Sequence, residues 1–313
     1  MEQVTCDYCG GGEYVTVARQ TDIIHRTTVE MFSIVSCNGC GLHYLNPRPT
    51  RDEIGRYYAE QYSFHAVPSR FRLLAADALD AIANSPLHAL FGWIPFVKYK
   101  LGARVKPRIA DPVLRHIAPG TRPRILDIGC GSGVSAHFWG YRGSLRHYGG
   151  IASVCGVEVG DQARRELSNS GIEAFRSIDD IPAAARFDII RMNWSLEHVH
   201  SPSSYFAFIA ARLAARGKAV IAVPNYEGLL YRIARDCVEI PIHLFHFRKR
   251  KQMHLHAEAL RRGGKPLVFN PAVFIVGKPQ TARHFPARGK ARFPIEFLVE
   301  LNRIFQHLRD GSR

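Results

Sequence analysis

The chain has 313 residues, of which 46% are hydrophobic and 22% are charged, and its formal net charge is +15. This composition excludes wholesale disorder, and the length suffices for one full α/β domain with a small appendage. The sequence begins MEQVTCDYC without a basic region followed by an apolar one, and its longest apolar stretch, residues 86–97, is shorter than a membrane span. We therefore expect a soluble, cytoplasmic protein with no transmembrane segment.

Four of the seven cysteines form two CxxC pairs with 27 residues between them. They are Cys6, Cys9, Cys37 and Cys40. Each pair directs two sulfurs to one side of a tight turn, and two facing turns build a tetrahedral S4 site. Gly10 and Gly41 directly follow the pairs, where a positive φ is often required. We predict a structural zinc (Zn²⁺) ribbon over residues 1–50, in which the metal stabilises a unit too small to bury much core.

Two other interpretations of these cysteines are four free thiols and a redox pair. The remaining three cysteines are scattered, and an odd total in a chain without a secretory signal argues against a disulfide framework.

Residues 51–118 are expected to form a helical linker or lid. Apolar residues recur near the helical period at Arg51–Tyr58, Phe71–Ala83 and Ala103–Ile117. Prolines separate these segments, because proline interrupts a helix interior.

From Arg124 onward, short apolar runs alternate with longer amphipathic ones, which is typical of βαβ units and a parallel sheet. Strands are predicted at Ile125–Ile128, Ser153–Glu158, Glu173–Phe175, Asp188–Met192 and Ala219–Val223, and helices are predicted to begin near Gly133, Asp161 and Ser201. Two last runs, Leu267–Phe269 and Ala272–Val276, could add an antiparallel hairpin. The predicted fold is an α/β Rossmann-like sheet over residues 119–278, with helices on both faces.

A glycine-rich turn, ILDIGCGSG, follows the first of these strands at residues 125–133. Glycines let the backbone turn sharply and approach a ligand closely. The spacing is GxGxG, and Asp127 just before it would repel a pyrophosphate but suits an ammonium group. Glu158 ends the next strand, where a carboxylate can accept hydrogen bonds from ribose hydroxyls. A dinucleotide site or a turn without ligand are the alternatives.

The segments LDIGCGSG, GVEV, FDIIRMNWSLEHVHSP and AVIAVPN resemble the successive motifs of class I S-adenosylmethionine (SAM)-dependent methyltransferases, over about residues 124–225. This resemblance implies methyltransferase activity with SAM (S-adenosyl-L-methionine) as the cofactor. It also implies that Glu158 holds the ribose, that Asp179 lies near the adenine and that Asn193 lies beside the sulfonium. The residues implied for the methionine part are Asp127, Gly129, Gly131 and Gly133.

The continuation of the ribbon, CGLHYLNPRPT at residues 40–50 and YYAEQY at residues 57–62, resembles the N-terminal module of a methyltransferase subset linked to sugar and polysaccharide modification. This second resemblance implies a sugar, nucleotide-sugar or glycan acceptor.

Two groups of polar residues are candidates for the reacting end of the site. Glu197 and His198 follow the fourth strand, and His198 has a pKa suited to proton transfer near neutrality. The segment PIHLFHF contains His243 and His246 after the fifth strand. We predict that His198 with Glu197, or His243 instead, is the catalytic base. The alternatives are a helix cap that braces the cofactor loop and buried structural histidines.

Residues 248–313 contain 15 Lys and Arg against 4 Asp and Glu. This charge favours an anionic acceptor or partner, although a solvated basic tail explains it equally well. An RNA methyltransferase that binds phosphates is the alternative function, although no Asn-Pro-Pro-Tyr base-flipping motif is present. A non-catalytic SAM-binding protein is a third hypothesis. Residues 279–313 are predicted to form a basic tail with a terminal amphipathic helix, which would contact a membrane under this hypothesis or simply pack on the fold.

Overall fold

A computed structural model describes residues 1–58, 71, 113, 116–118, 120–133, 145–227, 239–248, 266–268 and 273–277. The chain forms two compact units. The first consists of Met1–Glu60, Trp194–Ala211 and Ile221–Arg313, and the second of Gln61–Asn193 and Arg212–Val220. The four-segment division expected from the sequence stays a prediction, and most of the basic C-terminal segment lies outside the described residues.

The first unit contains a four-stranded antiparallel sheet with the order β1-β2-β3-β9. The strands are β1 (Tyr14–Gln20), β2 (Phe32–Cys37), β3 (His43–Leu45) and β9 (Phe245–His246). Phe32, Ile34 and Val35 of β2 are buried, whereas the edge strand β1 is largely exposed. The fourth strand comes from the PIHLFHF segment, about 200 residues beyond β3 in the sequence, and the sequence analysis did not predict this pairing.

The prediction of a helix over Arg51–Tyr58 is wrong, because the helical segment that forms there is shorter. Only a single 3-10 turn forms, η1 (Ile54–Tyr57), and the backbone of Tyr58 is extended. The Thr50 side chain binds the amide of Glu53 at 3.3 Å, and the Glu53 carboxylate binds the amide of Thr50 at 3.1 Å. Tyr57 then packs edge-on against Phe32, with ring centroids 5.7 Å apart, which holds the short turn against the sheet. The other two predicted helices lie almost wholly outside the described residues.

The second sheet has the strand order β10-β11-β8-β7-β4-β5-β6. Its strands are β4 (Arg124–Ile128), β5 (Ser153–Val157), β6 (Glu173–Phe175), β7 (Phe187–Asn193), β8 (Leu213–Ala222), β10 (Pro266–Val268) and β11 (Val273–Gly277). Strand β4 pairs in parallel with β5 and β7, and β5 pairs in parallel with β6. The predicted parallel sheet is confirmed, as is the antiparallel hairpin of β10 and β11. Only β8 differs much, because it begins six residues before the predicted start.

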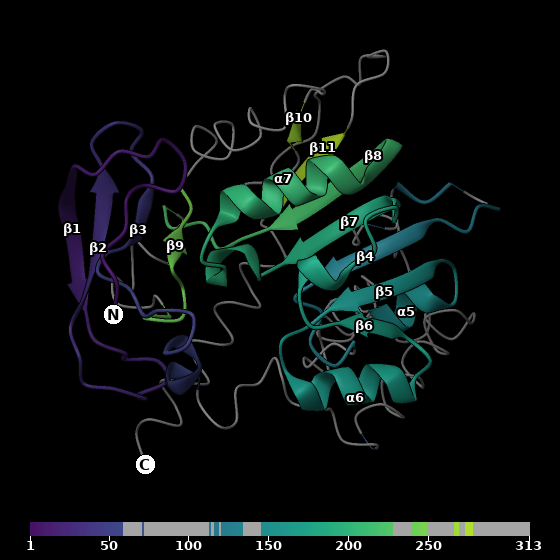
Figure 1. The fold of residues 1–313 in the computed structure, drawn as a ribbon, viewed down its shortest axis with the longest axis horizontal. Helices are drawn as coiled ribbons and strands as arrows, with labels where there is room; N and C mark the ends of the chain where they lie inside the picture. Colours follow the sequence, from purple (N-terminus) through teal and green to yellow (C-terminus); the bar gives the residue numbers. More distant parts are fainter. Residues whose placement is uncertain are drawn as a thin grey trace, which may run out of the picture. The chain divides into compact units, whose positions relative to one another are not determined.

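Helices of the second unit pack on this sheet through a small apolar cluster. Leu145 of α5 (Leu145–Gly149) and Leu167 of α6 (Asp161–Asn169) are buried together with Ile172. Figure 1 shows α6 alongside β6, the edge strand of the sheet. A Cβ atom on Gly133 would lie 2.4 Å from Leu167 Cδ2, so the last glycine of the glycine-rich turn must lack a side chain.

Helix α7 (Pro202–Arg212) begins next to its predicted start. The helix predicted to follow Gly133 falls on residues 134–144, outside the described residues. Among the helices that the structure describes, none has the length and apolar character needed to cross a bilayer.

Candidate cofactor and acceptor sites

The glycine-rich turn and Glu158 meet where two parallel strands end side by side. Ile128 of β4 is in register with Val157 of β5, and the Gly129 amide donates to the Val157 carbonyl at 2.8 Å. The Glu158 carboxylate accepts from the Gly131 amide at 2.9 Å and from the Gly160 amide at 2.8 Å, and only 4% of the residue is exposed. Each carboxylate oxygen keeps a further lone pair that a ligand hydroxyl can use.

The three glycines of the turn all have the left-handed backbone that favours glycine, with φ values of 76°, 56° and 71° at Gly129, Gly131 and Gly133. Between them, Cys130 packs tightly, because a Cβ atom on Gly156 would lie 2.4 Å from its Sγ. Burial raises the pKa of the Cys130 thiol well above its ordinary value, and the charges of Asp127 and Glu158 raise it further. Cys130 is therefore a neutral packing group rather than a nucleophile.

Asp127 forms an ion pair with Arg191, which the sequence analysis missed. Arg191 lies directly opposite Asp127 on the neighbouring strand β7, and its Nη1 contacts Asp127 Oδ2. Both residues are buried, with 1% of Asp127 and 8% of Arg191 exposed. A buried carboxylate is stable as an anion only when it is paired. The available signal was a charged residue inside the otherwise apolar run IIRM at residues 189–192.

The other predicted cofactor residues lie at the same edge of the sheet. Asn193 is the last residue of β7, and Asp179 lies in η3 (Ile178–Asp180), shortly after β6. Strands β4 to β7 that carry or precede these residues are parallel, so their carboxyl ends share one edge. Ligands bind at this edge in open α/β sheets. Their individual roles as cofactor contacts stay predictions.

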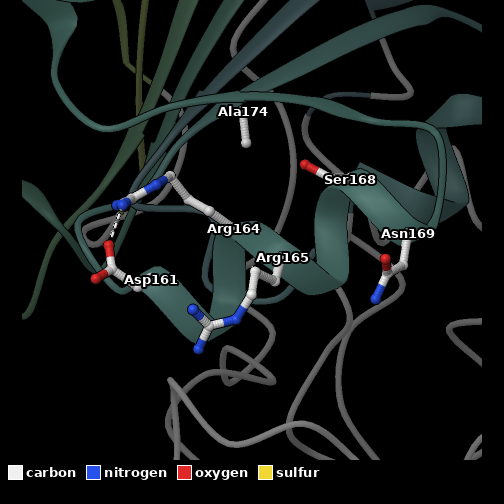
Figure 2. A pocket seen from close by; sticks show the side chains of 6 residues that line it. All are labelled: Asp161, Arg164, Arg165, Ser168, Asn169 and Ala174. Atoms are coloured by element: carbon white, nitrogen blue, oxygen red, sulfur yellow. Dashed lines mark hydrogen bonds and ion pairs between the residues drawn. The ribbon is translucent and has the colours of Figure 1, made fainter.

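A hollow of about 380 Å³ lies elsewhere on the second unit, along α6 (Figure 2). Its lining residues are Asp161, Arg164, Arg165, Ser168, Asn169 and Ala174, and none of them belongs to the predicted cofactor set. Figure 2 shows Arg164 directed at Asp161. The Arg164 guanidinium also donates to the carbonyls of Glu158 and Val159, both at 2.7 Å. Arg164 therefore fixes the backbone that carries Glu158 instead of serving a ligand in this hollow.

A cluster of polar residues in the first unit contains the three predicted catalytic side chains. Glu197 and His198 lie in the 3-10 turn η4 (Leu196–His198), and the ring of His243 stands nearly perpendicular to that of His198, with centroids 4.6 Å apart. The Tyr58 hydroxyl is 3.2 Å from His198 Nδ1. On the other side of the ring, His198 Nε2 is 3.9 Å from Glu197 Oε1, and Glu197 is fully buried.

A second buried carboxylate, that of Glu239, lies close to the His243 ring. Glu239 Oε2 is 3.2 Å from His25 Nε2 and 3.7 Å from His243 Nε2. Burial lowers the pKa of His243 well below its ordinary value, and the neighbouring histidines lower it further. Burial likewise lowers the pKa of His246 in β9 to about 3. Both histidines are therefore neutral near pH 7, and His198 has the most exposed side chain of the three histidines, at 16%.

Glu197, His198 and His243 could also be considered as metal ligands, because their ligand atoms all lie within 4.8 Å of one another. A tetrahedral zinc ion with bonds of about 2.1 Å to nitrogen and oxygen places neighbouring ligand atoms about 3.4 Å apart. The 3.9 Å between His198 Nε2 and Glu197 Oε1 is wider than this. The arrangement suits a proton acceptor beside a stabilising anion better than a metal ion.

Comparison with known proteins identifies the family. A family model described as "Methyltransferase domain" matches residues 101–265, more than half of the chain. The chain belongs to this methyltransferase family. The glycine-rich turn, the two carboxylates and the parallel strand order described above agree with this family.

Curated relatives match this methyltransferase over a limited part of its sequence. A "tRNA U34 carboxymethyltransferase" from Sodalis glossinidius is 33% identical over 129 residues, and one from Pseudoalteromonas translucida is 30% identical over 132 residues. Each alignment covers 38% of this chain, and the chain spans about 37% of the length of these relatives.

Solved structures of methyltransferases are similar at lower identity. A "possible histamine N-methyltransferase" from Thermotoga maritima has a TM-score of 0.41 at 15% identity, covering 65% of this chain and 99% of its own. The N-methyltransferase NodS from Bradyrhizobium japonicum, solved with S-adenosyl-L-homocysteine, has a TM-score of 0.39 at 13% identity, covering 66% of this chain and 99% of its own.

The four N-terminal cysteines of this methyltransferase lie together in the first unit. Cys6 and Cys40 have their Sγ atoms 3.4 Å apart, as do Cys9 and Cys37, and all four sulfurs lie within 4.8 Å of one another. Zinc–sulfur bonds of about 2.3 Å in a tetrahedron place sulfurs about 3.8 Å apart. The four thiols therefore fit a single tetrahedral zinc ion.

The backbone around the cysteines has the form expected of two metal-binding turns. Gly10 and Gly41 both have a φ of 73°, which confirms the positive φ predicted after each pair. Burial raises the pKa of the Cys37 thiol, but the amides of Cys40 and Gly39 and the Cys9 thiol outweigh burial and lower it to about 7. Amides directed at a sulfur stabilise the thiolate that a metal binds.

Proposed function

We propose that this methyltransferase binds SAM at the carboxyl edge of strands β4 to β7. Asp127 and the glycine-rich turn would hold the methionine part, and Glu158 would hold the ribose. Asp179 would lie near the adenine and Asn193 near the sulfonium. The observation that carries the proposal is the pair of carboxylates, at 127 and 158, positioned by adjacent parallel strands. When bound, SAM supplies an electrophilic methyl group and leaves as S-adenosylhomocysteine.

His198 is proposed as the base that takes the proton from the acceptor's nucleophile. Its Nε2 gains a proton as the nucleophile bonds to the methyl carbon, and Glu197 at 3.9 Å stabilises the resulting imidazolium. In the tautomer in which Nδ1–H donates to the Tyr58 hydroxyl oxygen, Nε2 is the nitrogen that accepts the proton. The ring of His243 is neutral and stands nearly perpendicular to the His198 ring. This arrangement suits a contact that orients His198 or the acceptor.

We propose an RNA nucleoside, with tRNA first, as the acceptor. The curated relatives are named as tRNA-modifying enzymes, and the net charge of +15 favours a polyanion. A sugar, nucleotide-sugar or glycan acceptor is the second candidate. It is favoured by the ribbon continuation CGLHYLNPRPT, which resembles the module of sugar-modifying methyltransferases.

We further propose that the four cysteines bind one structural zinc ion. Four protein ligands close the coordination sphere, so the ion would stabilise the ribbon and take no part in methyl transfer. Thiols available for zinc also suit a reducing compartment, which is the basis for proposing a cytoplasmic location.

Two measurements test the proposal. Calorimetry with S-adenosylhomocysteine should detect binding to the zinc-loaded chain, and an absence of heat would contradict the cofactor assignment. Labelled SAM should then be offered with unmodified tRNA, with the same tRNA after nuclease digestion, and with a panel of nucleotide sugars. Label in intact tRNA supports the first acceptor, and label in a nucleotide sugar supports the second.

The base is tested in the variant His198→Ala. Its transfer rate should fall about 100-fold, because a positioned general base contributes at least that factor, while S-adenosylhomocysteine affinity stays unchanged. A variant that keeps the full rate would show that His198 is not the base.

A further inference from the structure

The first cysteine turn is hydrogen-bonded to the start of helix α7. Asp7 lies between Cys6 and Cys9, and its carboxylate accepts from the Ser201 hydroxyl at 2.7 Å. It also accepts from the amide of Ser203 at 2.8 Å and from its hydroxyl at 3.0 Å. The first amides of a helix have no partner within the helix, and an anion there is favoured by the helix dipole. Asp7 therefore caps a helix almost 200 residues away in the sequence.

Residue His200, next to the start of α7, also forms hydrogen bonds with Arg48 and Pro49. Arg48 Nη1 donates to the His200 carbonyl at 2.7 Å, and His200 Nε2 is 3.1 Å from the Pro49 carbonyl. Only Val199 separates His198 from residues 200–203. The segment that follows Glu197 and His198 is thus held by Asp7 of the first cysteine turn and by Arg48 and Pro49, which follow β3.

The segment that carries His243 is held by the ribbon as well. The Leu45 amide of β3 donates to the Leu244 carbonyl at 2.9 Å, and the Leu244 amide donates to the Glu197 carbonyl at 2.8 Å. Residues of β3 and β9 are then paired in register, His43 with His246. A continuous set of backbone hydrogen bonds therefore joins the ribbon sheet to both parts of the proposed acceptor cluster.

We propose that Asp7 is a positioning residue for the acceptor cluster, and that metal binding by the four cysteines sets the position of Glu197 and His198 through it. This inference rests on the proposed function. The Asp7 backbone lies inside a CxxC turn that is closed by backbone hydrogen bonds of Cys6 and Gly10 and whose two sulfurs would be fixed by the metal. We expect loss of the metal to loosen this turn and to weaken the hydrogen bonds of the Asp7 carboxylate to Ser201 and Ser203.

Hydrogen exchange of the full-length, zinc-loaded chain tests this coupling without any need for activity. In Asp7→Asn, amides of residues 196–204 should exchange about tenfold faster, because a neutral amide accepts these hydrogen bonds more weakly than the carboxylate and is not favoured by the helix dipole. Chelation of zinc should give the same increase there and in residues 243–247, while residues 124–128 of β4 stay protected. The control is Asp52→Asn, which removes an exposed carboxylate of the same unit. Unchanged exchange at 196–204 in both Asp7→Asn and the chelated chain would overturn the proposal.

Kinetics separate positioning from mere stabilisation. With one zinc retained per chain, Asp7→Asn should lower kcat about tenfold, because a displaced His198 is a poorer base, while S-adenosylhomocysteine affinity changes less than twofold. A lower melting temperature with an unchanged kcat would show that Asp7 only stabilises the fold, and would overturn the proposal. Ser203→Ala, which keeps the backbone bond to Asp7, should show a smaller effect in the same direction.

The two proposals fail in distinguishable ways. If the wild-type chain transfers no methyl group to any acceptor offered, the proposed function fails, and the exchange experiment still decides whether Asp7 and zinc position residues 196–204. If transfer occurs and both Asp7 readouts are unchanged, only the positioning role fails.

Discussion

Replacing Arg191 by methionine removes the cation that faces Asp127 across β7 and β4 while keeping most of the aliphatic volume. Asp127 is only 1% exposed and Arg191 only 8%, so water cannot replace the lost partner. Breaking a buried ion pair by removing one member costs about 3–5 kcal/mol, because the remaining charge stays buried. The guanidinium also lies 5.8 Å from the centre of the Tyr148 ring, and the loss of this contact adds up to about 1 kcal/mol.

The assay is urea unfolding of four proteins: the wild type, Arg191→Met, Asp127→Asn and the double variant. We expect each single variant to lose several kcal/mol of unfolding free energy, and the double variant to lose clearly less than the sum, since it leaves no unpaired charge. The coupling energy should be at least about 1.5 kcal/mol, within the range found for residues in contact.

Additivity of the two losses within about 0.5 kcal/mol would refute this reasoning, because groups without energetic coupling add to that precision. A change in the urea dependence itself would indicate an altered unfolded state and would call for the same cycle by thermal unfolding. S-adenosylhomocysteine affinity, measured alongside, should fall in both single variants, since Asp127 is proposed to contact the cofactor.

Three further outcomes are expected. Glu158→Gln should weaken S-adenosylhomocysteine binding about 10- to 100-fold by calorimetry, because it replaces charge-assisted hydrogen bonds to ribose by neutral ones; an unchanged affinity would remove Glu158 from the site. Gly133→Ala should destabilise the second unit by at least about 1 kcal/mol in thermal unfolding, since φ is 71° and the new Cβ would lie 2.4 Å from Leu167 Cδ2. Burial lowers the pKa of His43 to about 4 and of His246 to about 3. The unfolded chain therefore binds protons first as the pH falls below about 6.5, and stability should drop by about 3 kcal/mol for each histidine between pH 6.5 and 4; a His246→Leu variant should lose part of this dependence.

Much of this protein could be predicted from local pattern alone. Alternating apolar runs located every strand from β4 to β8, because a buried parallel strand must be apolar whatever its neighbours are. The positive φ values at Gly10, Gly41 and the glycine-rich turn follow from residue type, since only glycine adopts them without strain. The clustering of the four cysteines likewise follows from spacing, because two CxxC turns place their sulfurs on one side.

Contacts between segments distant in sequence needed the tertiary structure. The pairing of β3 with β9, the Asp7 cap on α7 and the ion pair of Arg191 with Asp127 each join residues between 60 and about 200 positions apart. No periodicity encodes such partners, because hydrogen bonds and ion pairs depend on how strands and turns are placed in space. The short turn at Ile54–Tyr57 was mispredicted for a related reason: packing of Tyr57 on Phe32 outweighs weak local helix propensity. Sequence alone thus determined which strands carry the proposed cofactor residues and that the four cysteines cluster, whereas the tertiary structure decided which residues hold these groups in place.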